Sequence, residues 1–161
     1  MLKPFFFSPT QGKLSFEQVV EEIVSFISKD PQRIYRLIVG TDSEGKKNPS
    51  FVSAIVIYCQ GKGGRYFWQR LNFKKTFYTL REKIYQETML SLKLATKLRK
   101  ALEKKLKKNY KDLEIHTDIG QVGETKDMIK EIVAIIKGNG FQPKIKPEAF
   151  GATNVADRCL R

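Results

Sequence analysis

The spacing of apolar residues divides the first half of the chain into one helix and three extended segments. Apolar positions recur at helical spacing over residues 15–29, where Ser15 and Gln18 form a capping-box sequence. Three apolar runs rich in β-branched and aromatic residues follow, with short polar turns between them, at residues 35–41, 51–58 and 65–73. Such short turns join antiparallel neighbours, so we predict a three-stranded meander.

The second half of the chain alternates between helical and extended patterns. A helical stripe of apolar residues runs from Leu80 to Leu106, and a shorter one covers residues 125–137. Short strands are predicted at 113–117 and 141–148, and a final short helix follows Asn154. The chain is therefore expected to be an α/β protein. We predict a mixed sheet formed by the meander and then an α-β-α-β-α order, with an extra N-terminal helix.

The length and apolar content fit one folded unit. The 161 residues, 41% of them hydrophobic, are enough for a single core, so we predict one domain over residues 1–161. Residues 1–32 are expected to form an N-terminal extension that carries the amphipathic helix. No segment has the roughly 18 consecutive apolar residues that cross a membrane. The two cysteines, Cys59 and Cys159, form no metal-ligand pair, and we expect a reduced, cytoplasmic protein without a membrane partner.

The charge of the chain favours a polyanionic partner. Thirty Lys and Arg residues against 17 Asp and Glu residues give a formal net charge of +13. Nucleic acid is the partner that this excess indicates first. The alternative is a solvated, lysine-rich surface, because much of the excess lies on one helix, between Lys97 and Lys108.

Two aspartates follow predicted strands in similar local sequences. Asp42 follows Gly40-Thr41, and Asp118 follows His116-Thr117. If the two strands are parallel neighbours, both carboxylates emerge at the same edge of the sheet, where α/β proteins bind ligands. Adjacent carboxylates repel each other unless a proton or a cation lies between them. Oxygen-only ligands suit Mg²⁺ best.

The phase of the long helix adds a glutamate to this edge. Each helical residue turns ~100°, so Glu87 lies on the border of the apolar stripe and Glu82 faces solvent. Taken alone, an aspartate after a strand is a common turn former or helix cap, and a glutamate on a helix flank is commonly solvated. The joint placement of the three acids is what favours a shared site.

The order of elements and acids resembles ribonuclease H. An Asp in the first strand of the meander, a Glu in the first crossover helix and an Asp after the fourth strand match that pattern. The segment from Asn154 to Asp157 is similar to the start of the last helix in that superfamily, which makes Asp157 the fourth acid. Longer segments resemble the YkuK family of ribonuclease H-like proteins, namely Phe7–Thr10, Val39–Ser43, Gly63–Phe67, Glu114–Gly120 and Pro147–Asp157.

This resemblance implies a metal-dependent nuclease that hydrolyses the phosphodiester bonds of RNA, DNA or a hybrid. Two Mg²⁺ or Mn²⁺ ions would be held by four catalytic, metal-binding acids, Asp42, Glu87, Asp118 and Asp157. An alternative is a nucleic-acid-binding module of the same fold that has no catalytic activity. A scaffold without any role in nucleic-acid binding is the third hypothesis.

Two further sets of residues have open interpretations. His116, the only histidine, either handles protons beside the acids or is a hydrogen-bonded residue of the sheet. Four residues of the third meander strand either stack on a substrate and contact its phosphates or pack under the helices; they are Arg65, Tyr66, Trp68 and Arg70.

Overall fold

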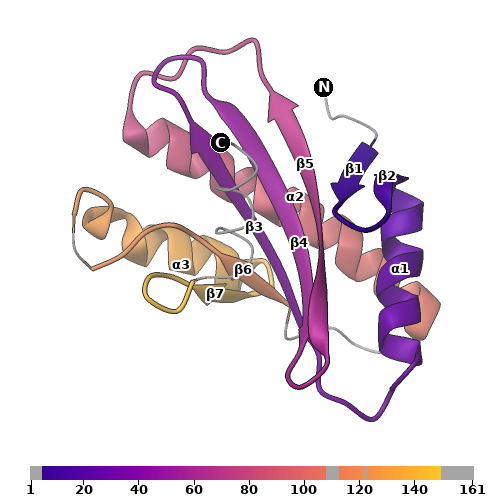
Figure 1. The fold of residues 1–161 in the computed structure, drawn as a ribbon. Helices are drawn as coiled ribbons and strands as arrows, with labels where there is room; N and C mark the ends of the chain where they lie inside the picture. Colours follow the sequence, from indigo (N-terminus) through magenta and orange to yellow (C-terminus); the bar gives the residue numbers. More distant parts are fainter. Residues whose placement is uncertain (1–4, 108–112, 122, 150–161) are drawn as a thin grey trace.

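A single seven-stranded sheet organises the protein. The computed structural model describes residues 5–107, 113–121 and 123–149 (Figure 1). The strand order is β2-β1-β5-β4-β3-β6-β7. The strands are β1 Phe5–Ser8, β2 Gly12–Ser15, β3 Arg36–Glu44, β4 Ser50–Cys59, β5 Gly63–Asn72, β6 Glu114–His116 and β7 Gln142–Lys144. The helices are α1 Phe16–Ser28, α2 Leu80–Leu106, α3 Ile129–Gly138 and a 3₁₀ turn, Lys126–Met128, that leads into α3.

The pairing of the strands confirms the predicted mixed sheet. β3, β4 and β5 form the antiparallel meander, while β6 pairs parallel to β3 and β7 pairs parallel to β6. The helix α2 connects β5 to the β6 side of the sheet and crosses behind the meander in Figure 1. A parallel neighbour requires such a crossover, because a short turn reverses the chain direction.

The structure differs from the sequence-based expectation at the N-terminus, in β3 and in β7. The residues before α1 form a hairpin, β1 and β2, which joins the meander through β5. β3 runs on to Glu44, so Asp42 lies inside the strand and pairs with Val52, whereas it was expected just after the strand. β7 covers only Gln142–Lys144, and it is the edge strand that Pro143 predicted. The predicted final helix lies outside the described residues.

The helix expected at residues 15–29 is present as α1. The Ser15 side chain accepts a hydrogen bond from the Gln18 amide, and the Gln18 side chain accepts one from the Ser15 amide, as the capping-box sequence predicts. Val19, Val20 and Ile23 are buried against the same core as the rest of the chain. α1 is therefore packed into the folded unit.

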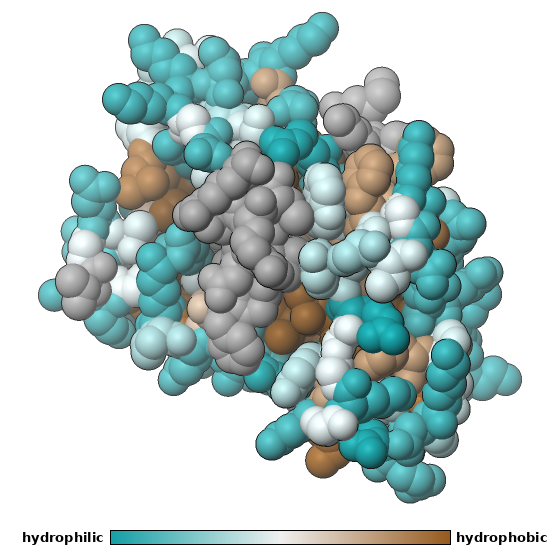
Figure 2. Space-filling view, viewed as in Figure 1, coloured by the Kyte–Doolittle hydropathy of each residue, from teal (hydrophilic) through white to brown (hydrophobic). Residues whose placement is uncertain are grey.

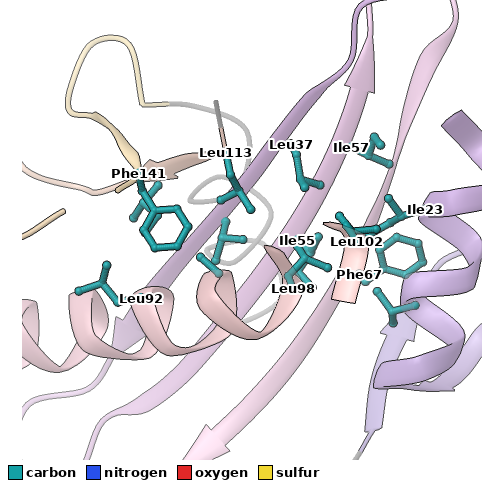
Figure 3. Packing of buried hydrophobic residues seen from close by; sticks show 14 of the residues in the cluster. Ile23, Leu37, Ile55, Ile57, Phe67, Leu92, Leu98, Leu102, Leu113 and Phe141 are labelled. Atoms are coloured by element: carbon teal, nitrogen blue, oxygen red, sulfur yellow. The ribbon is translucent and has the colours of Figure 1, made fainter. Parts of the chain in front are cut away.

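One large apolar cluster holds the helices on one face of the sheet. The exterior viewed in Figure 2 is mostly hydrophilic, with separate small apolar patches. Inside, Leu98 and Leu102 of α2 lie among Ile55 of β4 and Phe67 of β5, as Figure 3 shows. Both leucines are fully buried. None of the described helices is both long enough and apolar enough to cross a membrane.

A buried cluster of hydroxyl groups fixes α2 over β3 and β4. The Thr41 hydroxyl lies 2.7 Å from the Ser53 hydroxyl and 2.8 Å from the Ser91 hydroxyl. These side chains come from β3, β4 and α2, and all three residues are buried. Because a hydroxyl in the core loses water and needs a partner, the cluster favours one position of α2 along the sheet.

We expect Ser91→Ala to destabilise the protein by about 1–2 kcal/mol, because the buried Thr41 hydroxyl loses one partner. Urea denaturation measures this change. The matched control is Ser50→Ala, which removes an exposed hydroxyl bonded to Asn72 and should change stability by less than about 0.5 kcal/mol. An equal effect of the two substitutions would show that the cluster does not fix the helix.

Candidate functional site

The parallel register of β3 and β6 places two of the predicted acids at matching positions. Gly40 pairs with His116, and each of the two aspartates lies two residues further along its own chain segment. Asp42 and Asp118 therefore stand at equivalent points past the last pair of this parallel ladder. β6 ends at His116, so β3 has no neighbour on that side at Asp42 among the described residues.

The helix α2 brings Glu87 to the same part of β3. The Ser43 hydroxyl donates a short hydrogen bond to the Glu87 carboxyl. Ser91 contacts Thr41 one helical turn further on, so two successive contacts follow the inner face of α2 along β3. The Glu87 side chain is thus held against the strand, as the helical phase predicted, rather than extended into solvent.

Alternation along β3 separates Asp42 from the residue that Glu87 contacts. Successive strand residues point to opposite faces, so Asp42 shares its face with Ile38 and not with Ser43. The Asp42 carboxylate accepts a 2.9 Å hydrogen bond from the Ser43 amide. The acid from the helix and the acid from the strand therefore approach the same stretch of β3 from its two faces.

Glu87 is the most perturbed carboxyl group of this region. Its pKa is raised from 4.5 to about 8, mainly by burial and also by the negative charges of Asp42 and Asp118, while the Ser43 hydroxyl and the Lys83 charge act in the opposite direction. The carboxyl therefore carries a proton over most of the range below pH 8. The three acids are electrostatically coupled, as expected for carboxylates that share a site.

Asp118 has a cationic partner of its own. The Lys146 ammonium group lies 2.9 Å from the Asp118 carboxylate, and both side chains are largely exposed. The loops that carry them are tied together, because the Lys146 amide donates to the Ile119 carbonyl over 2.8 Å. A Cβ at Gly120 would lie 3.1 Å from the Lys146 Cβ, so the close approach of the two loops depends on this glycine.

The described residues do not close a metal site by themselves. No group of three or more His, Cys, Asp and Glu side chains among them lies close enough to hold a metal ion. Glu87 is bonded to Ser43, and Asp118 is paired with Lys146. Asp157, the fourth predicted ligand, lies outside the described residues. Carboxylate oxygens are suitable ligands for a hard divalent cation. In this structure, however, Glu87 and Asp118 contact Ser43 and Lys146 and do not converge on one point.

His116 belongs to a buried ionic network of the sheet. Its side chain is fully buried, and its Nε2 lies 2.9 Å from the Glu114 carboxylate, which also accepts two hydrogen bonds from Arg36. Burial raises the pKa of Glu114, but the hydrogen bonds from Arg36 and His116 outweigh it and hold the pKa at about 2. Since the ionised carboxylate only accepts, Nε2 donates. The hydrogen-bonded interpretation of His116 is confirmed.

The sequence interpretation missed the other two members of this network. Arg36 and Glu114 lie on the neighbouring strands β3 and β6, 78 residues apart in sequence, and their guanidinium and carboxylate groups meet at 2.6 Å. The available signal was Glu114 itself, a charged residue between the apolar Leu113 and Ile115 in the short strand predicted at 113–117.

The candidate substrate residues of β5 divide between the two faces of the sheet. Tyr66 and Trp68 pack against the small cluster of Ile38, Val52 and Ala54, on the face that Asp42 shares. The Arg65 guanidinium lies 5.1 Å from the Phe26 ring of α1. Tyr66 and Trp68 thus lie on the face opposite the main core, and a substrate role for the set that includes Arg70 stays a prediction.

The antiparallel meander followed by parallel strands makes this a mixed α/β protein, which is consistent with a ribonuclease H-like fold. The family model described as "Ribonuclease H-like" matches residues 18–161, so the chain belongs to that family. The match begins within α1, and it does not mark this helix as an addition to the family fold.

A relative from Bacillus subtilis (strain 168) extends the likeness over nearly the whole chain. The uncharacterized protein YkuK is 31% identical over 167 residues, which cover 95% of this chain and 95% of the relative. No solved structure matches the chain significantly.

We expect Glu87→Gln to stabilise the metal-free protein increasingly as pH rises. The folded-state pKa of Glu87 is about 8, whereas its ordinary value is 4.5. Between these two pH values the unfolded chain releases the proton and the folded chain keeps it, so the wild type loses stability as pH rises. Glutamine keeps the shape and the Ser43 bond without this cost. Urea denaturation in EDTA should show little difference near pH 4.5 and a gain on the order of a few kcal/mol above pH 8.

Glu103→Gln on the same helix is the matched control. Its effect on the free energy of unfolding should be small and should not grow with pH. If the Glu87→Gln gain were the same at pH 4.5 and pH 8.5, the raised pKa of Glu87 would be contradicted.

Proposed function

We propose that this protein is a metal-dependent nuclease that hydrolyses phosphodiester bonds of RNA, DNA or a hybrid. The observation that carries the proposal is the electrostatic coupling of the buried Glu87 to Asp42 and Asp118, which follow the last residue pair of the parallel strands β3 and β6 in a ribonuclease H-like sheet. A buried carboxyl that is also close to two other carboxylates destabilises the metal-free fold. Such an arrangement is typical of sites that are selected for binding or chemistry rather than for stability.

The donor set suits Mg²⁺ or Mn²⁺. Asp42, Glu87 and Asp118 offer only carboxylate oxygens, which hard divalent cations prefer, and Asp157 is the fourth proposed ligand. When bound, such ions lower the pKa of a coordinated water and offset the charge that develops on a phosphate. Two ions held by these four acids are the arrangement that we propose.

The protein's own side chains would have distinct tasks in this site. Ser43 holds the Glu87 carboxyl at β3, and the proton on Glu87 takes the place of a cation when none is bound. Lys146 neutralises Asp118 in the same way. Because both side chains are largely exposed, this ion pair contributes only about 0–1 kcal/mol and can open at little cost.

The surface charge of the chain suits a phosphate backbone. The net charge is +13, and Lys97, Lys100 and Lys104 are exposed on α2. Each lysine near a phosphate releases condensed counterions, so binding would weaken steeply as salt is added. The charge would serve to attract and hold the polymer, whereas the acids would act on one phosphodiester bond.

A second function is a nucleic-acid-binding module without catalytic activity. It is favoured by the absence of a three-ligand group among the described residues and by the Asp118–Lys146 ion pair. In that case the acids would contribute to the structure of the site but not to hydrolysis.

We expect the wild-type protein with Mn²⁺ to cleave nucleic acid, and Asp42→Asn to reduce the rate at least a hundredfold. The amide removes one negative ligand but keeps the size and the strand pairing of the residue. The measurement is cleavage of labelled single-stranded RNA, DNA and hybrid duplexes. Asp127→Asn, an exposed aspartate of the 3₁₀ turn, is the matched control and should cleave at the wild-type rate.

Salt-sensitive binding with no cleavage of any substrate would contradict the nuclease and support the binding module. Equal cleavage by wild type and Asp42→Asn would show that the activity does not belong to this site.

A further inference from the structure

A cavity of about 810 Å³ lies beside α2, and none of Asp42, Glu87 and Asp118 contributes to its wall. Its wall includes Phe6 of β1, Phe16 of α1, Leu71 of β5, and Leu90 and Leu94 of α2. The volume falls within the range of roughly 300–1,000 Å³ that small-molecule sites occupy. Most of its wall is apolar, so it favours a ligand with an apolar body.

The strand pairing explains why this space is not filled. β1 joins β5 through a single pair, Phe7 with Trp68, so the N-terminal hairpin does not follow the rest of β5. Beyond that pair, Gln69 and Leu71 of β5 face the cavity together with α2. The buried Ser53 hydroxyl in the wall is already bonded to Thr41. The Ser53 hydroxyl therefore does not need a hydrogen bond from a ligand.

The charged groups around the cavity all have the same sign. Lys93, Lys97 and Lys100 contribute to its wall, and no carboxylate does so among the described residues. The Lys97 ammonium group lies 4.1 Å from the centre of the Phe16 ring, so a cation is held directly beside the apolar wall. An apolar body next to fixed positive charge is complementary to an amphiphile with an anionic head.

We propose that this cavity binds a soluble amphiphilic carboxylate, with its aliphatic chain along the apolar wall and its carboxylate at Lys93 and Lys97. This inference does not depend on the proposed nuclease activity, because it uses none of the four acids. Nucleic acid would contact the same lysines but would not require the apolar wall.

The test is calorimetric titration of the full chain with dodecanoate below its micelle concentration. We expect saturable binding of one molecule per chain, with affinity rising about fourfold for each methylene added from octanoate to dodecanoate. Dodecyltrimethylammonium, with the same tail and a positive head, should bind at least tenfold more weakly.

Two pairs of variants locate the binding. Leu94→Trp fills the cavity and should weaken dodecanoate binding at least tenfold, whereas Leu106→Trp, a partly buried leucine of the same helix outside the cavity, should not. The Lys93→Glu/Lys97→Glu variant should also weaken it at least tenfold. The control Lys104→Glu/Lys105→Glu changes charge equally but outside the cavity, and should stay within about twofold.

Circular dichroism would verify that each variant is folded, and the surface lysine variants keep the test independent of core packing. The proposal is overturned if wild type shows no saturable dodecanoate binding, or if both pairs of lysine variants weaken binding equally.

Discussion

The contact between α2 and β3 is the constraint on which the rest of the candidate site depends. The Thr41 hydroxyl meets Ser91 and Ser53 in the core, and Ser43 meets Glu87 one helical turn away. An apolar helix face alone could slide along a sheet with little loss of burial. Hydroxyl groups that lack water need their partners at one distance, so they set the position of the helix. That position brings a carboxyl from α2 to the strand that carries Asp42.

Two of the carboxyl groups near the end of β3 are neutralised without a bound metal ion, Glu87 by a proton and Asp118 by a lysine. Glu87 has a pKa of about 8, and Asp118 is paired with Lys146. Each of these arrangements can be reversed, because a proton can leave and an exposed ion pair can open. By contrast, the Arg36–Glu114–His116 network is bonded more completely, and the pKa of Glu114 is held at about 2, so it stays ionised at higher pH. The two groups therefore differ: Glu87 and Asp118 are held by reversible contacts, whereas Glu114 is fixed by three hydrogen bonds from Arg36 and His116.

Much of the fold could be predicted from the sequence because its signals are local. The capping box at Ser15, the apolar stripe of α2 and the β-branched runs of the meander each specify one element. The β1–β2 hairpin was missed because strands of four residues carry too little alternation to be seen. Its existence depends on pairing with β5, a contact between distant parts of the chain.

The site was predictable as a location but not as a set of contacts. The parallel pairing of β3 with β6 and the phase of α2 gave the neighbourhood of Asp42, Glu87 and Asp118. Strand alternation, which sends Asp42 and Ser43 to opposite faces, decides that Glu87 meets Ser43. The partnership of Asp118 with Lys146 joins two loops whose relative positions no local pattern encodes. Asp157 lies outside the described residues, and its role stays a prediction.

The most direct test of a shared cation site is to count the protons released when Mn²⁺ binds. Calorimetric titrations at pH 6.5, in two buffers of different ionisation enthalpy, give this number. Because the pKa of Glu87 is about 8, binding through its carboxylate should release close to one proton per chain, and Glu87→Gln should release none. Binding of Mn²⁺ with no proton release by the wild type, or no binding at all, would contradict the account.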